Sequence, residues 1–552
     1  MGFFISNLLN PEFGEINFKS AIILNSEAKE RSYMKKLFKN KTLIFLILVL
    51  VIASFFRLWK LNEIPPGLYP DVALNGNQAI AEPGKIFYPE NNGREGLMMW
   101  LITLSFSIFG VSIWSIKIVA AIIGILTVFG LYLLTKELFS QIVKQSNGQI
   151  VALLSSFFLA ISFWHTNFSR IGFRAILVPF ILVFGFYFLF RGFRTKKIYN
   201  LIISGIFFAL GFYTYISYRF IVLLLPLILL CWYFIYRKEK EIKKFFLFTI
   251  YCLIVAGIFA LPIGLYFLQN PHDFASRATQ VSVFDAENSF KEFGKSLILH
   301  LGMFNFYGDS NWRHNISDQP VLFWPIGIFF LIGLIYSIWK ILKFFKHRNW
   351  SLIIGYWLLI IWFFIMLLPG ILTSEGIPHS LRTIGAIPPI FIFAGLGAVI
   401  SWEKTKEIFK LKGKFGRQII IFSTVLMLIT LVFGEYYRYF VIWGKNPEVK
   451  GAFTTHYVEI GNYLNSFSPE TKKYVIVSPL PMPAQTPMFI ERTKFKEPQA
   501  IYLLPEEIGK IKIEGKTAII LMKCDENLLI ELSKNFPFGK IQEKNNICSY
   551  EF

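Results

Sequence analysis

Pro65-Pro66-Gly67-Leu68-Tyr69-Pro70-Asp71 is the stretch that interrupts the apolar beginning of this 552-residue chain. It follows a first apolar run that ends near Phe56. Three prolines and a glycine exclude a continuing helix, because proline lacks a backbone N–H and clashes with the preceding turn. The stretch is therefore a shaped turn, and it places one carboxylate, Asp71, just beyond the end of the run. A further polar tract, Glu82 to Glu95, precedes the next apolar residues.

The composition predicts an α-helical polytopic membrane protein. Hydrophobic residues make up 54% of the chain, the mean hydropathy is +0.52, and phenylalanine occurs 61 times. A soluble globular chain is only about 45–50% apolar. The apolar runs recur at lengths near those of a helix that crosses a hydrocarbon core of ~30 Å, which needs about 20 residues.

The formal net charge of +21 is concentrated in short links between the apolar runs. This distribution is typical of the positive-inside rule and does not indicate a nucleic-acid partner. The lysines of Lys35–Lys41 precede the first run and predict a cytoplasmic N-terminus. Four later links are also basic: Arg191–Lys197, Arg237–Lys244, Lys340–Arg348 and Lys404–Arg417.

The apolar run from Leu97 to about Ile116 decides the topology. Gly110 splits it, and the piece before that glycine is too short to cross a membrane. If the run lies in the interface, Ile118–Leu134 is the second span and the four basic links share the side of Lys35–Lys41. If it spans, all four links move outside, against the charge bias of the N-terminus. We therefore predict an interfacial helix in a first outer segment.

The chain is predicted to be a multi-pass protein of the cytoplasmic (plasma) membrane with about eleven spans. They are Thr42–Phe56, Ile118–Leu134, Ile150–His165, Ile176–Phe190, Leu201–Tyr215, Ile221–Tyr236, Phe245–Leu268, Val321–Ile341, Ser351–Leu372, Ile387–Ile400 and Gln418–Phe433. The predicted organisation is a cytoplasmic segment 1–41, a transmembrane domain 42–433 and an extracytoplasmic domain 434–552.

The C-terminal segment is predicted to be a small α/β domain. Tyr474–Ser478 and Thr517–Met522 are typical of short buried strands, and Tyr457–Phe467 of an amphipathic helix. Cys524 and Cys548 can pair if this domain is outside the cell.

Each short outer link carries arginine, against the general charge bias. Guanidinium groups bind phosphate oxygens through two parallel hydrogen bonds and stay charged at any relevant pH. A cluster of them that faces one carboxylate suits a phosphate-linked lipid substrate, although any single arginine can instead snorkel to lipid phosphate. The candidates for holding the donor phosphate are Arg170, Arg174, Arg219 and Arg382.

Further polar and aromatic residues are candidates for substrate binding, each with an ordinary alternative. Tyrosines at span ends also form interfacial belts, and a histidine can simply complete a loop. The candidates are Lys85, Arg94, Glu95, Tyr213, Tyr215, Tyr218 and His379. The histidines lack a spacing such as HExxH, so no catalytic zinc is predicted. A Walker loop and a GxSxG elbow are also missing from the sequence, so the energy is expected to come from an activated substrate rather than ATP.

These outer-face motifs resemble those of one family. The set comprises Gly67-Leu68-Tyr69-Pro70-Asp71 with Ala73-x-Asn75-Gly76, Asn91-Asn92-Gly93-Arg94-Glu95, Trp164-His165, Phe168-Ser169-Arg170-Ile171-Gly172-Phe173-Arg174, Leu210-Gly211-Phe212-Tyr213-Thr214-Tyr215 and His379-Ser380-Leu381-Arg382. In this order the set is similar to that of the bacterial family 39 glycosyltransferases, which are relatives of the protein O-mannosyltransferases and of the lipid A aminoarabinose transferase. It covers the span region to about residue 400.

The resemblance implies a C-type glycosyltransferase fold, an interfacial helix in the first loop and a polyprenyl-phosphate sugar donor. This chain departs from the family at Val72, where glutamate usually follows the aspartate, at Gly96, where proline is common, and at Lys117, where arginine is common. The loss of the second acid leaves Asp71 as the sole carboxylate of that pair.

The predicted function is transfer of a sugar to an acceptor hydroxyl on the outer face of the membrane, with Asp71 as base and inversion at the anomeric carbon. The acceptor can be a protein, a lipid or a glycan. No cofactor is required by this scheme, although a divalent cation at Asp71 stays possible. Two alternatives are open: Asp71 caps a helix that begins near Val72, or the protein is a lipid or glycan transporter. A transporter usually places its polar groups near the bilayer midplane, whereas here they gather at one face.

Overall fold

The computed structural model describes residues 41–142, 146–285, 288–346, 350–409, 413–544 and 546–552. The predicted cytoplasmic segment 1–41 thus lies outside the described residues except for Lys41. Parts of two basic links, 347–348 and 410–412, lie outside them as well.

Helices dominate the part that would lie in the membrane. Eight helices of the described chain are long and apolar enough to cross a bilayer, and three shorter apolar helices fall at the remaining predicted spans. The eight are Lys41–Leu58, Ile113–Phe139, Arg174–Thr195, Ile216–Lys238, Ile242–Gln269, Trp324–Lys343, Ile384–Ile408 and Gln418–Trp443. The three are Gly148–Ile161, Ile198–Gly211 and Gly355–Ile371. The prediction of a polytopic helical protein is confirmed, with eight candidate spans in the described chain against the about eleven predicted.

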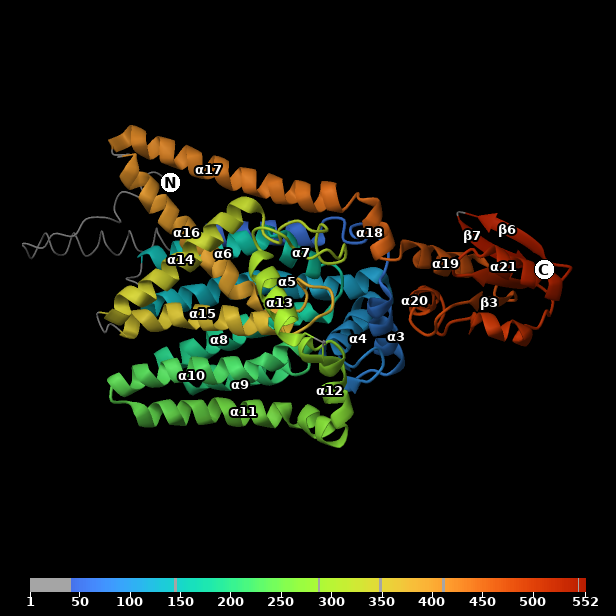
Figure 1. Cartoon of the computed structure of the whole chain (residues 1–552), viewed down its shortest axis with the longest axis horizontal. Coiled ribbons are helices and arrows are strands. Elements are labelled where there is room, and N and C mark those ends of the chain that lie inside the picture. Colours follow the sequence, from blue (N-terminus) through green and yellow to red (C-terminus); the bar gives the residue numbers. More distant parts are fainter. Residues whose placement is uncertain (1–40, 143–145, 286–287, 347–349, 410–412, 545) are drawn as a thin grey trace, which may run out of the picture.

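The spans form a bundle of roughly parallel helices (Figure 1). In chain order after the first helix they are α5 (Ile113–Ile142), α6 (Ser146–Ile161), α8 (Leu177–Thr195), α9 (Ile198–Gly211), α10 (Ile221–Lys238), α11 (Ile242–Gln269), α14 (Trp324–Lys346), α15 (Trp350–Ile371), α16 (Ile387–Ile408) and α17 (Gly413–Tyr436).

Helix α16 lies at the centre of this bundle, since almost all of its first half is buried. It packs against α14 and α6. Glycine makes this packing possible: a Cβ on Gly397 would meet the carbonyl oxygen of Phe329, and one on Gly333 would meet that of Phe393. Small residues at such crossings let helix backbones approach closely, as is common inside membranes.

The first outer segment folds over one end of the bundle (Figure 1). It contains α3 (Pro70–Ala81), an antiparallel pair of two-residue strands, β1 (Phe87–Tyr88) and β2 (Arg94–Glu95), and α4 (Leu97–Phe109). Helix α4 has 13 residues and is about 20 Å long, too short to cross a bilayer. It ends at Gly110, whose φ of 77° favours glycine, and α5 then begins at Ile113. The predicted break at this glycine is confirmed.

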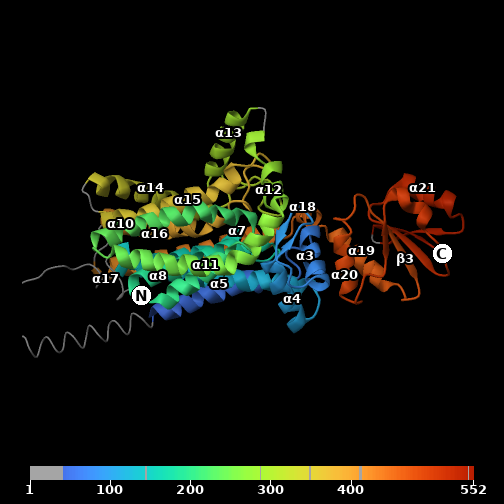
Figure 2. The ribbon, with the colours of Figure 1, turned by 90° about the horizontal axis from the view of Figure 1, so that it is seen from below.

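The remaining outer loops contain short helices. These are α7 (Phe163–Phe168), the 3₁₀ turns Arg174–Ile176, Ile216–Phe220, Val283–Asp285 and Ile384–Ala386, α12 (Pro271–Gln280) and α13 (Ser289–Gly302). Figure 2 shows α13 projecting from the side of the bundle at the same end as α3 and α4.

The C-terminal part is a small α/β unit beyond that end of the bundle (Figure 2). Its sheet has the order β4-β3-β5-β7-β6, with β3 parallel to β4 and β5, and β7 antiparallel to β5 and β6. The strands are β3 (Lys472–Ile476), β4 (Ile501–Leu503), β5 (Thr517–Leu521), β6 (Lys540–Lys544) and β7 (Ile547–Glu551). The helices are α18 (Pro447–Ala452), α19 (Thr455–Ser466), α20 (Gln485–Arg492), the 3₁₀ turn Pro505–Lys510 and α21 (Glu526–Asn535). The predicted small α/β domain is confirmed.

Two features join this unit to the bundle. The last apolar helix does not end at Phe433 as predicted but continues through a π-helical turn, Tyr437–Trp443. Helix α20 packs on α3, where Thr486 Oγ1 donates a 2.9 Å hydrogen bond to the carbonyl of Leu68 and Asn77 Nδ2 donates one of the same length to Gln485. The C-terminal unit thus rests directly on the turn that carries Asp71.

Candidate active site

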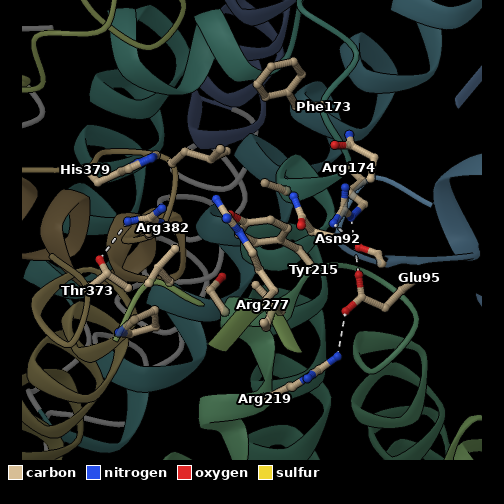
Figure 3. Close-up of a pocket in the computed structure, with 18 of the residues that line it drawn as sticks. Asn92, Glu95, Phe173, Arg174, Tyr215, Arg219, Arg277, Thr373, His379 and Arg382 are labelled. Atoms are coloured by element: carbon tan, nitrogen blue, oxygen red, sulfur yellow. Dashed lines mark hydrogen bonds and ion pairs between the residues drawn. The ribbon is translucent and has the colours of Figure 1, made fainter. Parts of the chain in front are cut away.

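A cavity of about 410 Å³ lies where the first outer segment meets the later outer loops. Its polar lining comes from six segments that are distant in sequence: the start of α3, the β1–β2 hairpin, the turn before α8, the turn before α10, helix α12, and the loop after α15 (Figure 3). The charged and histidine residues that line it are Asp71, Glu95, Arg174, Arg219, Asp273, Arg277, His379 and Arg382.

Asp71 stands in the first turn of α3 and lines this cavity. The helix begins at Pro70, which suits the first helical position because its fixed φ is helical, and Tyr69 is the N-cap. Asp71 therefore does not cap the helix, which was the predicted alternative. Within the described part of the chain, no donor forms a hydrogen bond to its carboxylate. It is free to accept one from a substrate.

Glu95 joins two arginines on one side of the cavity (Figure 3). Its Oε2 lies 3.3 Å from Arg174 Nε, and its Oε1 lies 3.4 Å from Arg219 Nη2. Glu95 is 3% exposed, whereas each arginine side chain is 18% exposed. Arg174 also stacks on the ring of Tyr215, with its guanidinium carbon 5.2 Å from the ring centre. One carboxylate thus holds two guanidinium groups on this side of the cavity.

Arg382 and Arg277 share a second carboxylate on the other side. Glu375 Oε2 lies 3.0 Å from Arg382 Nη2 and 3.2 Å from Arg277 Nη2, and its side chain is 61% exposed. Arg382 also donates to Thr373 Oγ1 at 2.9 Å and to the Glu375 carbonyl at 2.7 Å. Its anionic partner is thus a solvent-exposed group that a ligand can replace.

Comparison with known proteins agrees with this architecture. Residues 97–265 match the family model described as dolichyl-phosphate-mannose-protein mannosyltransferase. Among solved structures, ArnT from Cupriavidus metallidurans bound to undecaprenyl phosphate is 12% identical, with a TM-score of 0.55 over 93% of this chain and 98% of that one. This chain has the C-type glycosyltransferase fold. The resemblance predicted from the outer-face motifs is confirmed.

Two further relatives lie at similar distances. The oligosaccharyltransferase AglB from Archaeoglobus fulgidus, in complex with an inhibitory peptide and a dolichol-phosphate, is 15% identical with a TM-score of 0.50. That match covers 80% of this chain, which spans only 62% of the AglB chain. An uncharacterized protein of Aquifex aeolicus (strain VF5) is 23% identical over 411 residues, or 72% of this chain and 70% of that protein. The family match and these neighbours support a membrane glycosyltransferase of the C-type fold.

Arg170 does not reach the cavity of this glycosyltransferase fold, in contrast to its predicted phosphate-binding role. It is fully buried, and its guanidinium donates hydrogen bonds of 2.7–3.0 Å to the carbonyls of Phe56, Trp59, Lys60 and Ile64. These carbonyls lie at the end of the first helix and in the following turn, where helix carbonyls lose their intrahelical partners. Arg170 therefore holds the chain segment that leads to Asp71, and it has no donors left for a substrate.

Only one of the three predicted tyrosines lines the cavity. Tyr215 does so beneath Arg174. Tyr213 instead donates a 2.9 Å hydrogen bond to the carbonyl of Phe259, and Tyr218 donates one of 2.9 Å to the carbonyl of Phe208. The hydroxyl groups of Tyr213 and Tyr218 thus satisfy helix carbonyls in the bundle.

Lys85 and Arg94 also lie outside the cavity lining. Lys85 forms an exposed ion pair with Glu82, at 2.6 Å. Arg94 is fully buried and donates to Asn75 Oδ1 at 2.7 Å and to Gln78, so it ties β2 to α3 just behind Asp71. Burial, followed by the charge of Arg174, lowers the pKa of Arg94 to about 10, so it stays charged at neutral pH. Its role is to support the segment that holds Asp71.

His379 lines the cavity and belongs to a group that the sequence did not reveal. Asp309 Oδ2 lies 3.0 Å from His314 Nδ1 and 3.9 Å from His379 Nδ1. Burial, together with the charges of His314 and Arg382, lowers the pKa of His379 well below its ordinary value. Burial raises the pKa of Asp309, but the neighbouring histidines and the Asn311 N–H outweigh it and hold that pKa below its usual range.

Arg277 and Asp309 were not among the candidates predicted from the sequence. Arg277 lies on α12, and its local sequence shows only an exposed amphipathic helix. Asp309 lies between polar loop residues and gains its partners from His379 and Ser380, some 70 positions away. His314 is only five positions from Asp309, but the separation of 71 positions between Asp309 and Ser380 hides the rest of the group from the local sequence.

Proposed function

We propose that this protein transfers a sugar from a polyprenyl-phosphate donor to an acceptor hydroxyl inside this cavity. The proposal rests on one observation: the same cavity is lined by Asp71, whose carboxylate accepts no hydrogen bond within the described residues, and by a cluster of arginines. A C-type fold supplies the context, since ArnT was solved with undecaprenyl phosphate and AglB with a dolichol-phosphate.

Arg382 and Arg277 are proposed to hold the donor phosphate. Their present anionic partner, Glu375, is exposed and therefore contributes little to stability, so a phosphate can take its place. A guanidinium matches two phosphate oxygens with two parallel hydrogen bonds. As the sugar leaves, negative charge builds on this phosphate, and the two arginines stabilise it. Arg174 and Arg219 stay with Glu95 and set the charge around the sugar.

Asp71 is proposed to remove the proton from the acceptor hydroxyl. That oxygen then attacks the anomeric carbon from the face opposite the phosphate, and the carbon–oxygen bond to the phosphate breaks. The configuration at the anomeric carbon inverts. One carboxylate suffices for this scheme, and Val72 agrees with it: its side chain is 1% exposed and packs against Gly172, away from the cavity. The second acid common in the family has no counterpart here.

The cavity is proposed to open on the outer side of the membrane, with 1–41 inside, 42–433 as the membrane domain and 434–552 outside. The distribution of basic links supports this orientation. The disulfide between Cys524 and Cys548 supports it too, because such bonds persist in oxidising compartments. With Cys231 and Cys252 replaced by serine, an impermeant thiol reagent should label Lys540→Cys in whole cells and leave Lys240→Cys protected. The reverse pattern would place the site inside.

The decisive experiment is transfer in detergent by Asp71→Asn. Purified protein is mixed with a panel of polyprenyl phosphosugars and with protein, lipid or glycan acceptors, and product is read by mass. Transfer by Asp71→Asn should fall by about 10²–10⁴-fold, the usual contribution of a general base. Asparagine keeps the shape of the side chain, so donor binding and Tm should not change.

Asp273→Asn is the matched control. Asp273 also lines the cavity, but it accepts a 2.7 Å hydrogen bond from Tyr266. Its variant should keep near-normal transfer. Normal turnover by Asp71→Asn at saturating donor and acceptor would remove the base from the scheme. Activity in detergent also excludes a transporter as the sole function, because transport needs two compartments.

A further inference from the structure

Three side chains from two outer loops converge beside the cavity. Asp309 and His314 lie between α13 and α14, and His379 lies between α15 and α16. One ligand atom from each, a carboxylate oxygen and two imidazole nitrogens, lies within 4.8 Å of both others. The side chains of Asp309, His314 and His379 are only 3%, 4% and 14% exposed. Such a set is not a solvated surface cluster.

We propose that Asp309, His314 and His379 bind one divalent transition-metal ion of the zinc class. Imidazole nitrogen and carboxylate oxygen are its usual ligands, at roughly 2.0–2.2 Å from the ion. A tetrahedral ion at these distances separates its ligand atoms by about 3.3 Å. The Asp309–His314 separation of 3.0 Å, a hydrogen bond that an ion would replace, and the Asp309–His379 separation of 3.9 Å bracket that value. Magnesium and calcium fit less well, because they prefer six or more oxygen ligands.

The Nδ1 atom of His379 is the feature that protein contacts leave unexplained. It is buried and has no hydrogen-bond partner within the described residues. Asp309 Oδ2, 3.9 Å away, is too distant to accept a hydrogen bond from it. Buried polar atoms are nearly always paired, because an unpaired one loses its hydrogen bonds to water and gains none in return. A metal ion between His379 and Asp309 would supply the missing partner.

The surroundings of the three ligands resemble the outer shell of a metal site. Asp309 Oδ2 accepts hydrogen bonds from Ser380 N at 2.8 Å and Ser380 Oγ at 2.9 Å, which fix the carboxylate. The backbone N–H of His379 donates a 3.1 Å hydrogen bond to His300 Nε2, while His300 Nδ1 donates to the Ser296 carbonyl at 2.8 Å. Hydrogen bonds of this kind orient metal-ligating groups.

The proposed ion would connect the two loops next to Arg382. Three protein ligands leave a fourth position open for water or a substrate oxygen. His379 lines the cavity, and Arg382 follows it by three residues in the same loop. The ion would therefore hold in place the wall that carries Arg382. It differs from an ion at Asp71, and its ligands do not take part in the proton transfer proposed above.

Metal binding by the full-length protein tests this proposal without an activity assay. The protein is purified with an affinity tag that contains no histidine, stripped with chelator, and dialysed against Zn²⁺. Elemental analysis should find one zinc per chain, and added Zn²⁺ should raise the Tm of stripped protein. Asp309→Asn, His314→Ala and His379→Ala should each weaken zinc binding by at least about tenfold, because even outer-shell partners are worth 10–100-fold.

His272→Ala is the matched control. His272 lies 3.9 Å from the carboxylate of Asp273, the same separation as His379 from Asp309, but its side chain is 90% exposed and it has no third ligand. Its loss should leave zinc binding unchanged. If Asp309→Asn does not fold, Co²⁺ titration of the wild type and of His379→Ala decides the matter. The wild type should give the visible absorption of a tetrahedral ion, which Zn²⁺ abolishes.

The proposal is overturned if stripped wild type takes up no stoichiometric zinc and gives no such cobalt spectrum. It is also overturned if His314→Ala and His379→Ala each bind zinc as tightly as the wild type does. Neither result would contradict the proposed transfer reaction, which depends on Asp71 and the arginines.

Discussion

The two sides of the cavity hold their arginines in different ways. On one side Glu95 is 3% exposed and bridges Arg174 and Arg219. On the other, Glu375 is 61% exposed and bridges Arg277 and Arg382. On each side a carboxylate lies between two guanidinium groups, but the carboxylate of Glu95 is buried and that of Glu375 is exposed. Removing one partner from a buried pair leaves an uncompensated charge, whereas an exposed pair contributes little.

Because of this difference in burial, the two sides of the cavity have different roles. The Glu95 side is a permanent part of the structure, because the buried carboxylate of Glu95, 3% exposed, cannot exchange its arginine partners for water. The Glu375 side can release its carboxylate to water when an anion arrives. A phosphate that enters the cavity would thus be bound by Arg277 and Arg382, and Glu95 would keep Arg174 and Arg219 in place.

Glu95→Gln should produce the largest effect on this comparison. It keeps the shape of the side chain but leaves two partly buried arginines without their shared anion. Breaking a buried pair costs about 3–5 kcal/mol, so the Tm should drop and transfer should be strongly reduced. Thermal unfolding followed in detergent measures the first effect and product mass the second. An unchanged Tm would show that the two arginines do not depend on Glu95.

Arg382→Lys should have an intermediate effect, confined to the donor. Lysine keeps the charge but loses the planar pair of donors. A charge-assisted hydrogen bond is worth about 1.5–3 kcal/mol, so KM for the donor should rise by about 10- to 100-fold. The Tm should change little. Arg219→Lys is the control from the side of the buried Glu95, and it should lower the Tm more than it raises KM. An Arg382→Ala variant as active as wild type would exclude a role in phosphate binding.

The helical architecture was predictable from sequence, whereas the role of each arginine was not. Apolar runs and basic links indicate spans because burial in lipid acts on whole segments. Arg170 and Arg382 both lie in outer links between predicted spans. They differ in their hydrogen-bond partners. Arg170 donates to four backbone carbonyls of residues 56–64, whereas Arg382 forms an ion pair with an exposed carboxylate. Which partners each arginine meets depends on tertiary packing, which the local sequence does not reveal.

Residues contributed by distant loops were missed for the same reason. Arg277 has no motif around it, and it becomes part of the cavity only because α12 packs near the loop of Glu375. The position of Asp71 directly after the first turn was predictable, since proline and glycine mark that turn in the sequence. Its place inside the first helical turn, and not at the cap, follows from Pro70 at the first helical position.

Glu375→Gln should have the smallest effect. The direction of its change in donor affinity distinguishes the two sides of the cavity most clearly. The exposed pair contributes about 0–1 kcal/mol, so the Tm should stay within experimental error of wild type. Without the carboxylate, Arg277 and Arg382 lose a competitor of the donor phosphate. Arg382 still donates to the Glu375 carbonyl and to Thr373, so its position is kept. Donor affinity should therefore stay equal or rise by up to about fivefold, the equivalent of 1 kcal/mol. Glu95→Gln should lower transfer under the same conditions. A loss of donor affinity in Glu375→Gln comparable to that in Glu95→Gln would mean that both carboxylates position their arginines, and that neither side is free to exchange its partner for phosphate.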